Sequence, residues 1–118
     1  MSLLKSLFGR AKSKKSTPSL FDAAIEGDLA LVAKILEETP AALNKRDLGG
    51  DTALIYAAEK GHVHIVALLL KKGADTSCRD VHGNTAEMMA LKGGHMKAAA
   101  MLKRHNARLK LQATRQPL

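Results

Sequence analysis

The sequence repeats itself at an interval of 33 residues, and this repeat limits the possible folds more than any other feature. Residues 47–53 read Asp-Leu-Gly-Gly-Asp-Thr-Ala and recur at 80–86 as Asp-Val-His-Gly-Asn-Thr-Ala. An earlier copy, at 23–28, matches 57–62 at an interval of 34, because one extra residue lies within 37–39. A unit of this length cannot bury an apolar face alone, so the three copies are expected to stack side by side.

Each copy is predicted to form two short helices and a turn. Thr52 and Thr85 are suited to cap the first helix of their copy, because a threonine hydroxyl can accept a hydrogen bond from the opening turn. Gly61 and Gly94 stand where that helix must end, and glycine adopts the left-handed conformation without a steric penalty. Apolar stripes at helical spacing mark the second helix of the middle and first copies, at Val63, Val66, Leu69 and Leu70 and at Leu29, Val32, Ile35 and Leu36. We expect Leu69, in the middle copy, to be buried.

The composition agrees with packed helices. Apolar residues make up 46% of the chain and aromatic residues only 3%, so the core must be built from aliphatic side chains. Strands are enriched in aromatic and β-branched residues, and this composition therefore favours an all-α fold. Cys78 is the single cysteine, which excludes a disulfide within the chain. No apolar run approaches the roughly 20 residues that span a bilayer.

The middle copy resembles the ankyrin repeat. Residues 47–75 read Asp-x-x-Gly-x-Thr-Ala-Leu-Ile-Tyr-Ala-Ala-x-x-Gly-His-x-x-Ile-Val-x-Leu-Leu-Leu-x-x-Gly-Ala-Asp, which matches the pattern of that family closely. The resemblance covers residues 19–108. It implies an all-α, ankyrin-type helical solenoid of stacked helix-turn-helix repeats whose turn tips project to one side.

Three kinds of departure from the family pattern affect the expected fold. Ala53 and Ala86 replace the usual proline, and Ile55 and Met88 replace the histidine that normally ties the turn to its neighbour, so we expect a weaker turn network. Glu87 replaces a leucine that is normally buried. The first and third copies therefore resemble edge repeats, which carry a more polar outer face.

Charge and pattern together divide the chain into five segments. Residues 1–18 and 103–118 each contain five Lys or Arg and no acid, whereas 19–102 contain nine bases and eleven acids. The basic ends either aid solubility or attract anionic partners. The predicted segments are a basic, amphipathic N-terminal tail (1–18), repeat 1 (19–46), repeat 2 (47–79), repeat 3 (80–108) and a basic C-terminal tail (109–118).

The resemblance implies a protein–protein interaction module. Ankyrin arrays typically bind proteins through their turn tips and the exposed face of their first helices, which line a concave groove. Mapped by position, the groove candidates are Leu48, Gly49, Asp51, Tyr56, Glu59 and Lys60 in repeat 2, Val81, His82, Asn84, Lys92 and Gly93 in repeat 3, and Ile25 and Glu26 in repeat 1. Tyr56 is either an interface anchor or a ring packed between neighbouring first helices. The mixed charges of the groove do not indicate the sign of the partner's surface, and the oligomeric state is left open.

Catalytic and metal-binding interpretations find little support. His62 and His64 form the closest histidine pair. Side chains two residues apart on a helix point in directions about 200° apart, so these two histidines cannot bind the same ion. Cys78 has no triad-like motif around it and is expected to be an ordinary loop thiol facing solvent. The glycine pair at 49–50 lacks the Lys-Ser/Thr that follows in a phosphate-binding loop. We therefore expect no enzymatic activity, no metal and no cofactor.

The N-terminal segment is open to several interpretations. Leu3, Leu4, Leu7 and Phe8 fall on one face of a helix, with lysines and serines on much of the rest. This pattern is compatible with a helix lying on an anionic membrane through residues 1–15, with an organelle transit peptide, with a frayed tail, or with a helix docked on the first repeat.

These interpretations give two hypotheses for the function. The first is an adaptor or scaffold in the cytoplasm that binds a partner protein in the groove. The alternative is a peripheral membrane or nucleic-acid tether, in which the basic tails bind and the repeats only hold them in place. Nucleic acid is the less favoured partner, because the net positive charge belongs to the ends of the chain and not to the repeats.

Overall fold

Short polar side chains fix where the helices begin. The computed structural model describes residues 18–115, and in it the side chains of Ser19, Asp28, Thr52 and Thr85 each accept a hydrogen bond from an amide of the following turn. The predicted caps at Thr52 and Thr85 are confirmed, with oxygen-to-nitrogen distances of 3.2 and 3.3 Å. A cap of this kind contributes about 1 kcal/mol to the stability of a helix.

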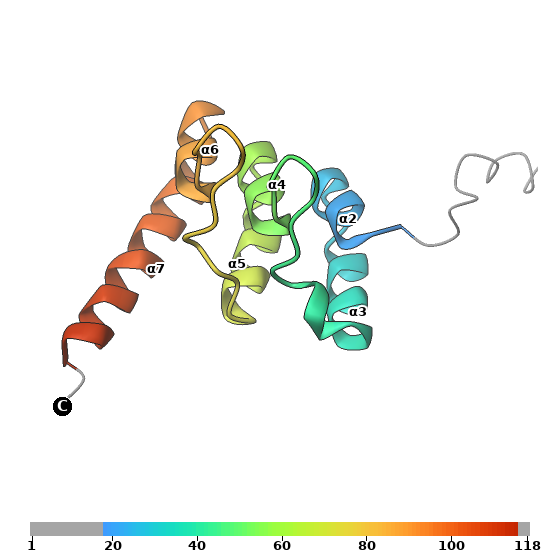
Figure 1. Ribbon diagram of the computed structural model, residues 1–118, viewed down its shortest axis with the longest axis horizontal. Helices are drawn as coiled ribbons and strands as arrows, with labels where there is room; N and C mark the ends of the chain where they lie inside the picture. The colour runs from blue at the N-terminus through green and yellow to red at the C-terminus, as the bar shows by residue number, and fades with distance from the viewer. Residues whose placement is uncertain (1–17, 116–118) are drawn as a thin grey trace, which may run out of the picture.

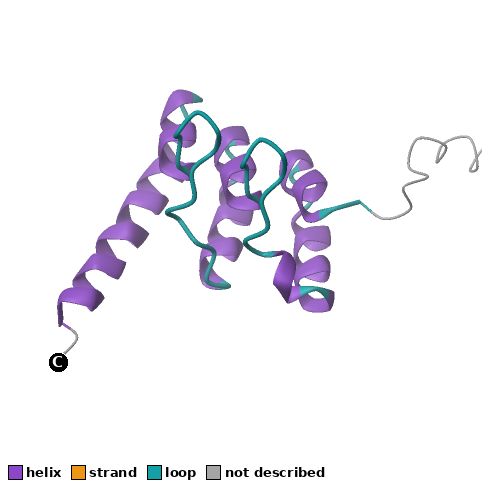
Figure 2. Cartoon of the chain, viewed as in Figure 1, coloured by secondary structure: helices purple, strands orange, loops and turns teal. Residues whose placement is uncertain are grey.

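The described residues form a stack of α-helices with one short 3-10 helix and no strand (Figures 1 and 2). The predicted all-α fold of stacked helical repeats is thus confirmed. The elements are α2 (Leu20–Glu26), α3 (Leu29–Glu38), η2 (Pro40–Ala42), α4 (Ala53–Lys60), α5 (Val63–Lys71), α6 (Ala86–Lys92) and α7 (Met96–Arg115).

Glycines end the first helices of the second and third repeats. Gly61 follows α4 directly with a φ of +76°, and Gly94 has the same φ two residues after α6. A residue with a Cβ is strained in this left-handed region, which is why glycine occupies both positions. The predicted left-handed conformation of both glycines is confirmed.

The helices are arranged in two rows. The first helices of the repeats form one row, in which α4 lies between α2 and α6, and the second helices form the other, in which α5 lies between α3 and α7. The loops that join successive repeats, 43–52 and 72–85, project on the same side of the stack (Figure 1). The middle repeat therefore has a neighbour on each side.

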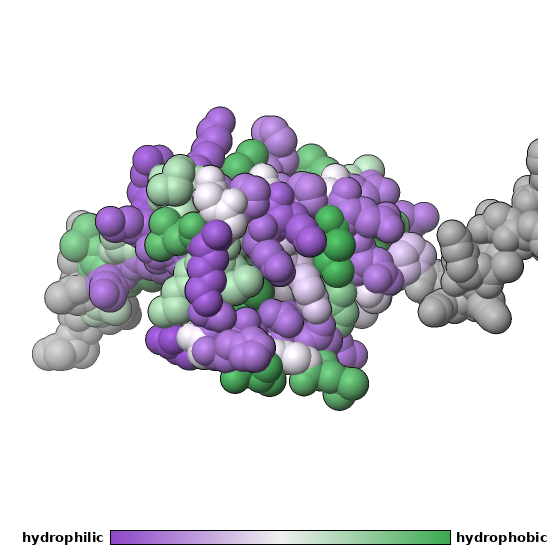
Figure 3. Space-filling model, turned by 90° about the horizontal axis from the view of Figure 1, so that it is seen from above, coloured by the Kyte–Doolittle hydropathy of each residue, from purple (hydrophilic) through white to green (hydrophobic). Residues whose placement is uncertain are grey.

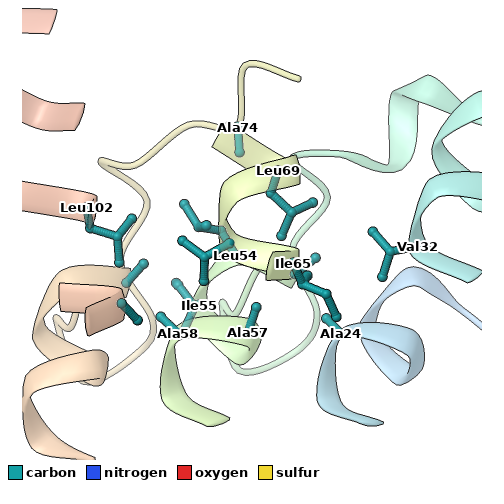
Figure 4. Packing of buried hydrophobic residues seen from close by; sticks show 14 of the residues in the cluster. Ala24, Val32, Leu54, Ile55, Ala57, Ala58, Ile65, Leu69, Ala74 and Leu102 are labelled. Carbon is teal, nitrogen blue, oxygen red and sulfur yellow. The ribbon is translucent and has the colours of Figure 1, made fainter. Parts of the chain in front are cut away.

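The core lies between the rows and between adjacent repeats. Leu54, Ile55, Ile65 and Leu69 are its largest fully buried side chains in the middle repeat, and they lie close to one another in Figure 4. The predicted burial of Leu69 is confirmed. The small side chains of α4, Ala57 and Ala58, are also fully buried, and their size lets neighbouring helices approach closely.

The third repeat keeps part of the corresponding surface in contact with solvent. Met88 occupies the position of Ile55, and 39% of its surface is exposed against 1% for Ile55. Glu87 occupies the position of the buried Leu54 and is half-buried. Its carboxylate accepts a hydrogen bond from the side-chain amide of Asn106 on α7 at 3.3 Å. This contact gives a half-buried carboxylate the polar partner that it requires.

The last helix extends beyond the stack. α7 continues through 109–115, the residues expected to form a separate basic tail, and it runs past the lower end of α5 (Figure 1). Among the described residues, no helix is long and apolar enough to cross a membrane. Leu3, Leu4, Leu7 and Phe8, the predicted membrane-facing residues, lie outside the described part of the chain.

Candidate protein-binding surface

The first turn tip, at residues 47–51, is held by the carboxylate of Asp47. One carboxylate oxygen accepts hydrogen bonds from the amides of Gly49 and Asp51 at 3.0 and 2.9 Å, and the other accepts one from the hydroxyl of Tyr56. Burial alone would raise the pKa of Asp47, but the bonds from Tyr56 and from the two amides outweigh it and hold the pKa below its usual value. The turn is therefore stabilised by an ionised carboxylate.

The second turn tip, at residues 80–84, is built in the same way. Asp80 accepts hydrogen bonds from the amides of Asn84 and His82 at 2.8 and 2.9 Å. The bond from the Asn84 amide is the main reason that the pKa of Asp80 lies below its usual value. In both repeats, the aspartate at the start of the turn accepts the hydrogen bonds that hold the tip.

Backbone and arginine contacts join the two tips. The amide of Val81 donates a hydrogen bond to the carbonyl of Gly49 at 2.9 Å. The guanidinium of Arg46 donates to the carbonyl of Gly50 at 3.3 Å and also to the carbonyl of Arg79 in the next repeat. The two tips are thus bonded to each other through the backbone and through Arg46.

Each tip ends in an exposed apolar side chain. Leu48 is fully exposed, and Val81, at the corresponding position of the next repeat, is 68% exposed. His82 beside it is also exposed. Neither apolar side chain contributes to the core, so both are free to contact another molecule.

Tyr56 packs between neighbouring first helices. Its ring meets Phe21 of α2 edge-on, with ring centroids 6.0 Å apart, and its hydroxyl donates to Asp47. The bond to Asp47, together with partial burial, raises the pKa of Tyr56 well above its usual value. Of the two interpretations of this residue, the structure therefore supports packing, since both the ring and the hydroxyl already have partners within the fold.

The arrangement of paired helices and projecting tips agrees with a comparison against known families. The family described as ankyrin repeats matches residues 20–113 in three copies. The chain is an ankyrin-repeat protein. Ankyrin repeats are generally protein–protein interaction modules and are typically non-catalytic.

Three curated proteins illustrate how far the likeness extends. The chain is 49% identical over 55 residues to human NAD-capped RNA hydrolase NUDT12, which covers 47% of this chain and 12% of the hydrolase. It is 44% identical over 59 residues to the probable E3 ubiquitin-protein ligase XBOS33 of Oryza sativa subsp. japonica, covering 49% of this chain and 11% of the ligase. It is 36% identical over 66 residues to mouse ankyrin repeat and SAM domain-containing protein 6, covering 56% and 8%. The chain thus spans about a tenth of the length of these relatives.

The other predicted groove residues of this ankyrin array lie at different depths. Lys60, Lys92, Gly93 and Glu26 are exposed, whereas Asp51, Glu59, Asn84, Gly49 and Ile25 are half-buried. Burial, and after it the nearby carboxylates of Asp47 and Asp80, raises the pKa of Asp51 above its usual value. The row of first helices, viewed from above in Figure 3, shows hydrophobic residues scattered among hydrophilic ones. The exposed members of the predicted set therefore form a mixed surface and not a continuous apolar patch.

Sequence reasoning did not include two exposed residues at the end of the stack and one residue that contacts the tips. Met88 and Leu91 on α6 are exposed apolar side chains, at 39% and 50%, and Arg46 links the two tips. The positions of Met88 and Leu91 correspond to the buried Ile55 and Ala58 of the middle repeat. The replacement of Ala58 by Leu91 was the signal in the sequence that could have predicted this exposure. A leucine fits at that position only where no neighbouring helix approaches closely.

The Gly-His pairs of the ankyrin repeats have a structural role. A Cβ at Gly27 would lie 2.8 Å from the ring of His62, and a Cβ at Gly61 would overlap the ring of His95 in the next repeat. A ring nitrogen of His62 also lies 3.0 Å from the carbonyl oxygen of Ile25. Each histidine therefore packs onto the glycine that ends the preceding first helix.

The remaining candidates for reactive chemistry are a metal site and the thiol of Cys78. Within residues 18–115, no group of three or more His, Cys, Asp or Glu is placed to hold a metal ion. Cys78 packs against the core and is half-buried, so the expectation of a solvent-facing thiol was wrong. Burial, and then the nearby carboxylate of Asp75, raises the pKa of Cys78. A raised pKa lowers the thiolate fraction, and with it the reactivity of the thiol.

Proposed function

We propose that this ankyrin array binds a partner protein through its two turn tips and the adjoining exposed face of α4 and α6. The observation that carries the proposal is the pair of exposed apolar side chains, Leu48 and Val81, at equivalent positions of two tips that are fixed to each other. Lys60, Lys92 and His82 supply the charged and polar rim. An apolar centre with a polar rim is the usual composition of a protein interface.

A complex would be stabilised because it removes the side chains of Leu48 and Val81 from water. An apolar side chain that is fully exposed gains nothing from folding, whereas burying a leucine or valine contributes about 1.5–3 kcal/mol. Because the described residues leave Leu48 fully exposed and Val81 mostly exposed, that stabilisation is available to a partner that covers them. The two residues are accordingly the expected hot spots of the interface.

The protein acts, in this proposal, by holding its partner and not by chemical transformation. Three titratable groups hold the turns: Asp47 and Asp80 accept hydrogen bonds from backbone amides, and the hydroxyl of Tyr56 donates one to Asp47. In this proposal the chain is an adaptor or scaffold and uses no cofactor.

The test compares partner capture by the intact chain and by a Leu48→Ser/Val81→Ser double variant. Leu111→Ser serves as a matched control, because Leu111 is also exposed but lies near the end of α7, away from the tips. Proteins captured by the intact chain are quantified by mass spectrometry, and the affinity of a purified captured protein is then measured by calorimetry.

We expect the double variant to lose at least about tenfold in affinity for a specific partner, since each lost apolar contact weakens binding by more than 1 kcal/mol. The control should bind as the unaltered chain does. Equal capture by all three proteins, with melting temperatures unchanged, would refute the proposal.

A further inference from the structure

A second surface lies on the row of second helices, away from the turn tips. Between α5 and α7 there is a hollow of about 340 Å³. Its apolar lining comes from Ala67, Leu70 and Met101, its cationic lining from Lys71, Arg104 and Arg108, and His105 adds an imidazole ring. None of the described residues that line it is acidic. Apolar residues beneath a cationic rim form a site that no function discussed so far requires.

The charge of this surface extends along α7. The sequence contains no Asp or Glu after Glu87, so α7 consists of basic, polar and apolar residues only. Arg104 and Arg108 follow Lys97 by seven and eleven residues. At 100° per residue, these intervals place the three side chains within about 40° of one another around the helix. Lys97, Arg104 and Arg108 are all exposed. Together with Lys71 at the end of α5, they form a basic strip beside the hollow.

We propose that this hollow binds an acidic amphipathic helix of a partner protein. The apolar side chains of such a helix enter the hollow over Leu70 and Met101, and its carboxylates pair with Arg104, Arg108 and Lys71. Arginine is suited to the role, because its planar guanidinium can bind a carboxylate through two hydrogen bonds. The site lies on a different row of helices from the turn tips, so the inference goes beyond the proposed function.

The shape of the site favours a helix over a membrane. Leu70 and Met101 are half-buried and lie in the hollow among the exposed cations. A bilayer is a broad surface and is entered by protruding apolar side chains, whereas a partner helix can lower its own side chains into a recess. The spacing also fits, since Lys97 and Arg104 are about 10 Å apart along the helix axis and a partner helix carries carboxylates every three or four residues.

The described residues that line the site include no Phe, Tyr or Trp ring on which a base could stack. Single strands are bound by stacking bases on aromatic rings. The two aromatic residues in the described part of the chain, Phe21 and Tyr56, pack against each other on α2 and α4. The apolar lining of the hollow has no counterpart on a phosphate backbone. An acidic protein helix is therefore the ligand that uses both the charge and the apolar floor.

The experiment uses a fluorescein-labelled 18-residue peptide that is designed to be helical, with leucines at positions 4, 8, 11 and 15 and glutamates on the flanking faces. A peptide of the same composition in scrambled order controls for charge alone. Anisotropy is measured against the full chain at about 50 mM salt. Vesicles of phosphatidylcholine with phosphatidylserine and a 20-nucleotide single strand of DNA are tested in parallel.

Two variants separate charge from shape. Arg104→Glu/Arg108→Glu reverses the rim, and Lys34→Glu/Lys45→Glu makes the same change in net charge at two exposed lysines of the first repeat. Ala67→Gln places a longer polar side chain at the hollow without altering the charge. Circular dichroism melting shows whether each variant is folded.

We expect the rim variant to weaken binding of the amphipathic peptide at least tenfold and the lysine control less than twofold. Ala67→Gln should weaken it several-fold, and Leu48→Ser/Val81→Ser should leave it unchanged, which keeps this proposal separate from the previous one. Equal binding of the scrambled peptide would overturn the proposal. So would binding of vesicles or DNA through the same arginines when the amphipathic peptide does not bind.

Discussion

The middle and third repeats have the same pattern but give equivalent positions different surroundings. Ile55 and Met88 occupy the same position, yet Ile55 is 1% exposed and Met88 is 39% exposed. Leu54 is fully buried, and Glu87 at its position is half-buried with Asn106 as its partner. The difference arises because α4 lies between α2 and α6, whereas α6 has a first helix on only one side within the described chain. In a repeat stack, burial depends on neighbours as much as on the repeat itself.

The alanine positions show the same rule from the opposite direction. Ala58 is fully buried where the first helices pack closely, and Leu91 replaces it in the third repeat with half of its surface exposed. A leucine at position 58 would overfill the contact between adjacent helices, which costs about 1–3 kcal/mol. Small residues thus mark the repeats that have a neighbour, and the larger residue marks the surface that has none.

The sharpest test of this comparison truncates the paired positions. Ile55→Ala should lower the free energy of unfolding by about 2–5 kcal/mol, because it removes a buried side chain and leaves a cavity. Met88→Ala should lower it by well under 1 kcal/mol, because that side chain is already partly in water. Urea denaturation followed by circular dichroism measures both. Equal losses for the two variants would mean that the neighbours do not determine burial in this stack.

A second test uses the paired glycines. Gly61→Ala and Gly94→Ala both place a Cβ at a φ of +76°, which alone costs about 1–2 kcal/mol. At Gly61 the new Cβ also overlaps the ring of His95, whereas at Gly94 it meets nothing within 4 Å. We expect Gly61→Ala to be the more destabilising by about 1 kcal/mol, as measured by thermal unfolding. If Gly94→Ala proves equal or worse, the histidine contact does not contribute to stacking.

A third test concerns the hydroxyl of Tyr56, which bonds to the first turn tip and has no counterpart at the second. Tyr56→Phe should cost about 1 kcal/mol at neutral pH, because it removes a hydrogen bond to the ionised carboxylate of Asp47. The position of Tyr56 is occupied by Met89 in the third repeat, so Asp80 serves as the internal control. Its pKa, followed by NMR, should not change in the variant.

The hydrogen bond between Tyr56 and Asp47 should also make the stability of the chain depend on pH. The pKa of Asp47 is lowered in the folded chain, so its stabilising effect is present above the unfolded value of about 3.9 and is lost as the pH falls through the folded value. Tyr56→Phe should reduce this loss on acidification. The pKa of Tyr56 is raised, so the intact chain should also lose stability as the pH rises above about 10, and the variant should lose less. Identical pH profiles for the two proteins would contradict the assigned bond.

The smallest effect is expected on the exposed face of α4. Lys60 belongs to the middle repeat, yet it is exposed, because the neighbouring repeats cover the sides of α4 and not this face. Lys60→Ala should change the free energy of unfolding by no more than about 0.5 kcal/mol, part of it from the lost charge in the last turn of the helix. A loss as large as that of Ile55→Ala would show that this face is covered in solution.

Local signals in the sequence predicted most of the fold. The capping threonines, Thr52 and Thr85, and the glycines that end the first helices act through bonds within a few residues. Leu69 was predictable because it lies in a stripe at helical spacing in a repeat with two neighbours. The helix was not predicted to continue beyond residue 108, because the basic charge of 109–118 indicated a separate tail. The absence of Gly and Pro between Gly94 and Pro117 is the signal that favours a continuous helix.

The parts that sequence reasoning missed depend on contacts between distant residues. The bond from Tyr56 to Asp47 joins residues nine apart, and Arg46 reaches a carbonyl 33 residues away. The half-burial of Cys78 likewise depends on packing against the core. No local pattern encodes such contacts, so the mapped groove residues could be placed by repeat position but not by depth.

The hydrogen bond between Val81 and Gly49 fixes the spacing between the two turn tips. Loops usually lose conformational freedom when they bind, and that loss opposes association. In this chain the ordering has already taken place during folding, because the backbone of one tip holds the backbone of the next. The distance between Leu48 and Val81 is therefore set by the stacking of the repeats. In the proposed interface, a partner would be selected by whether two recesses on its own surface are one repeat apart, and each additional repeat would add the same distance.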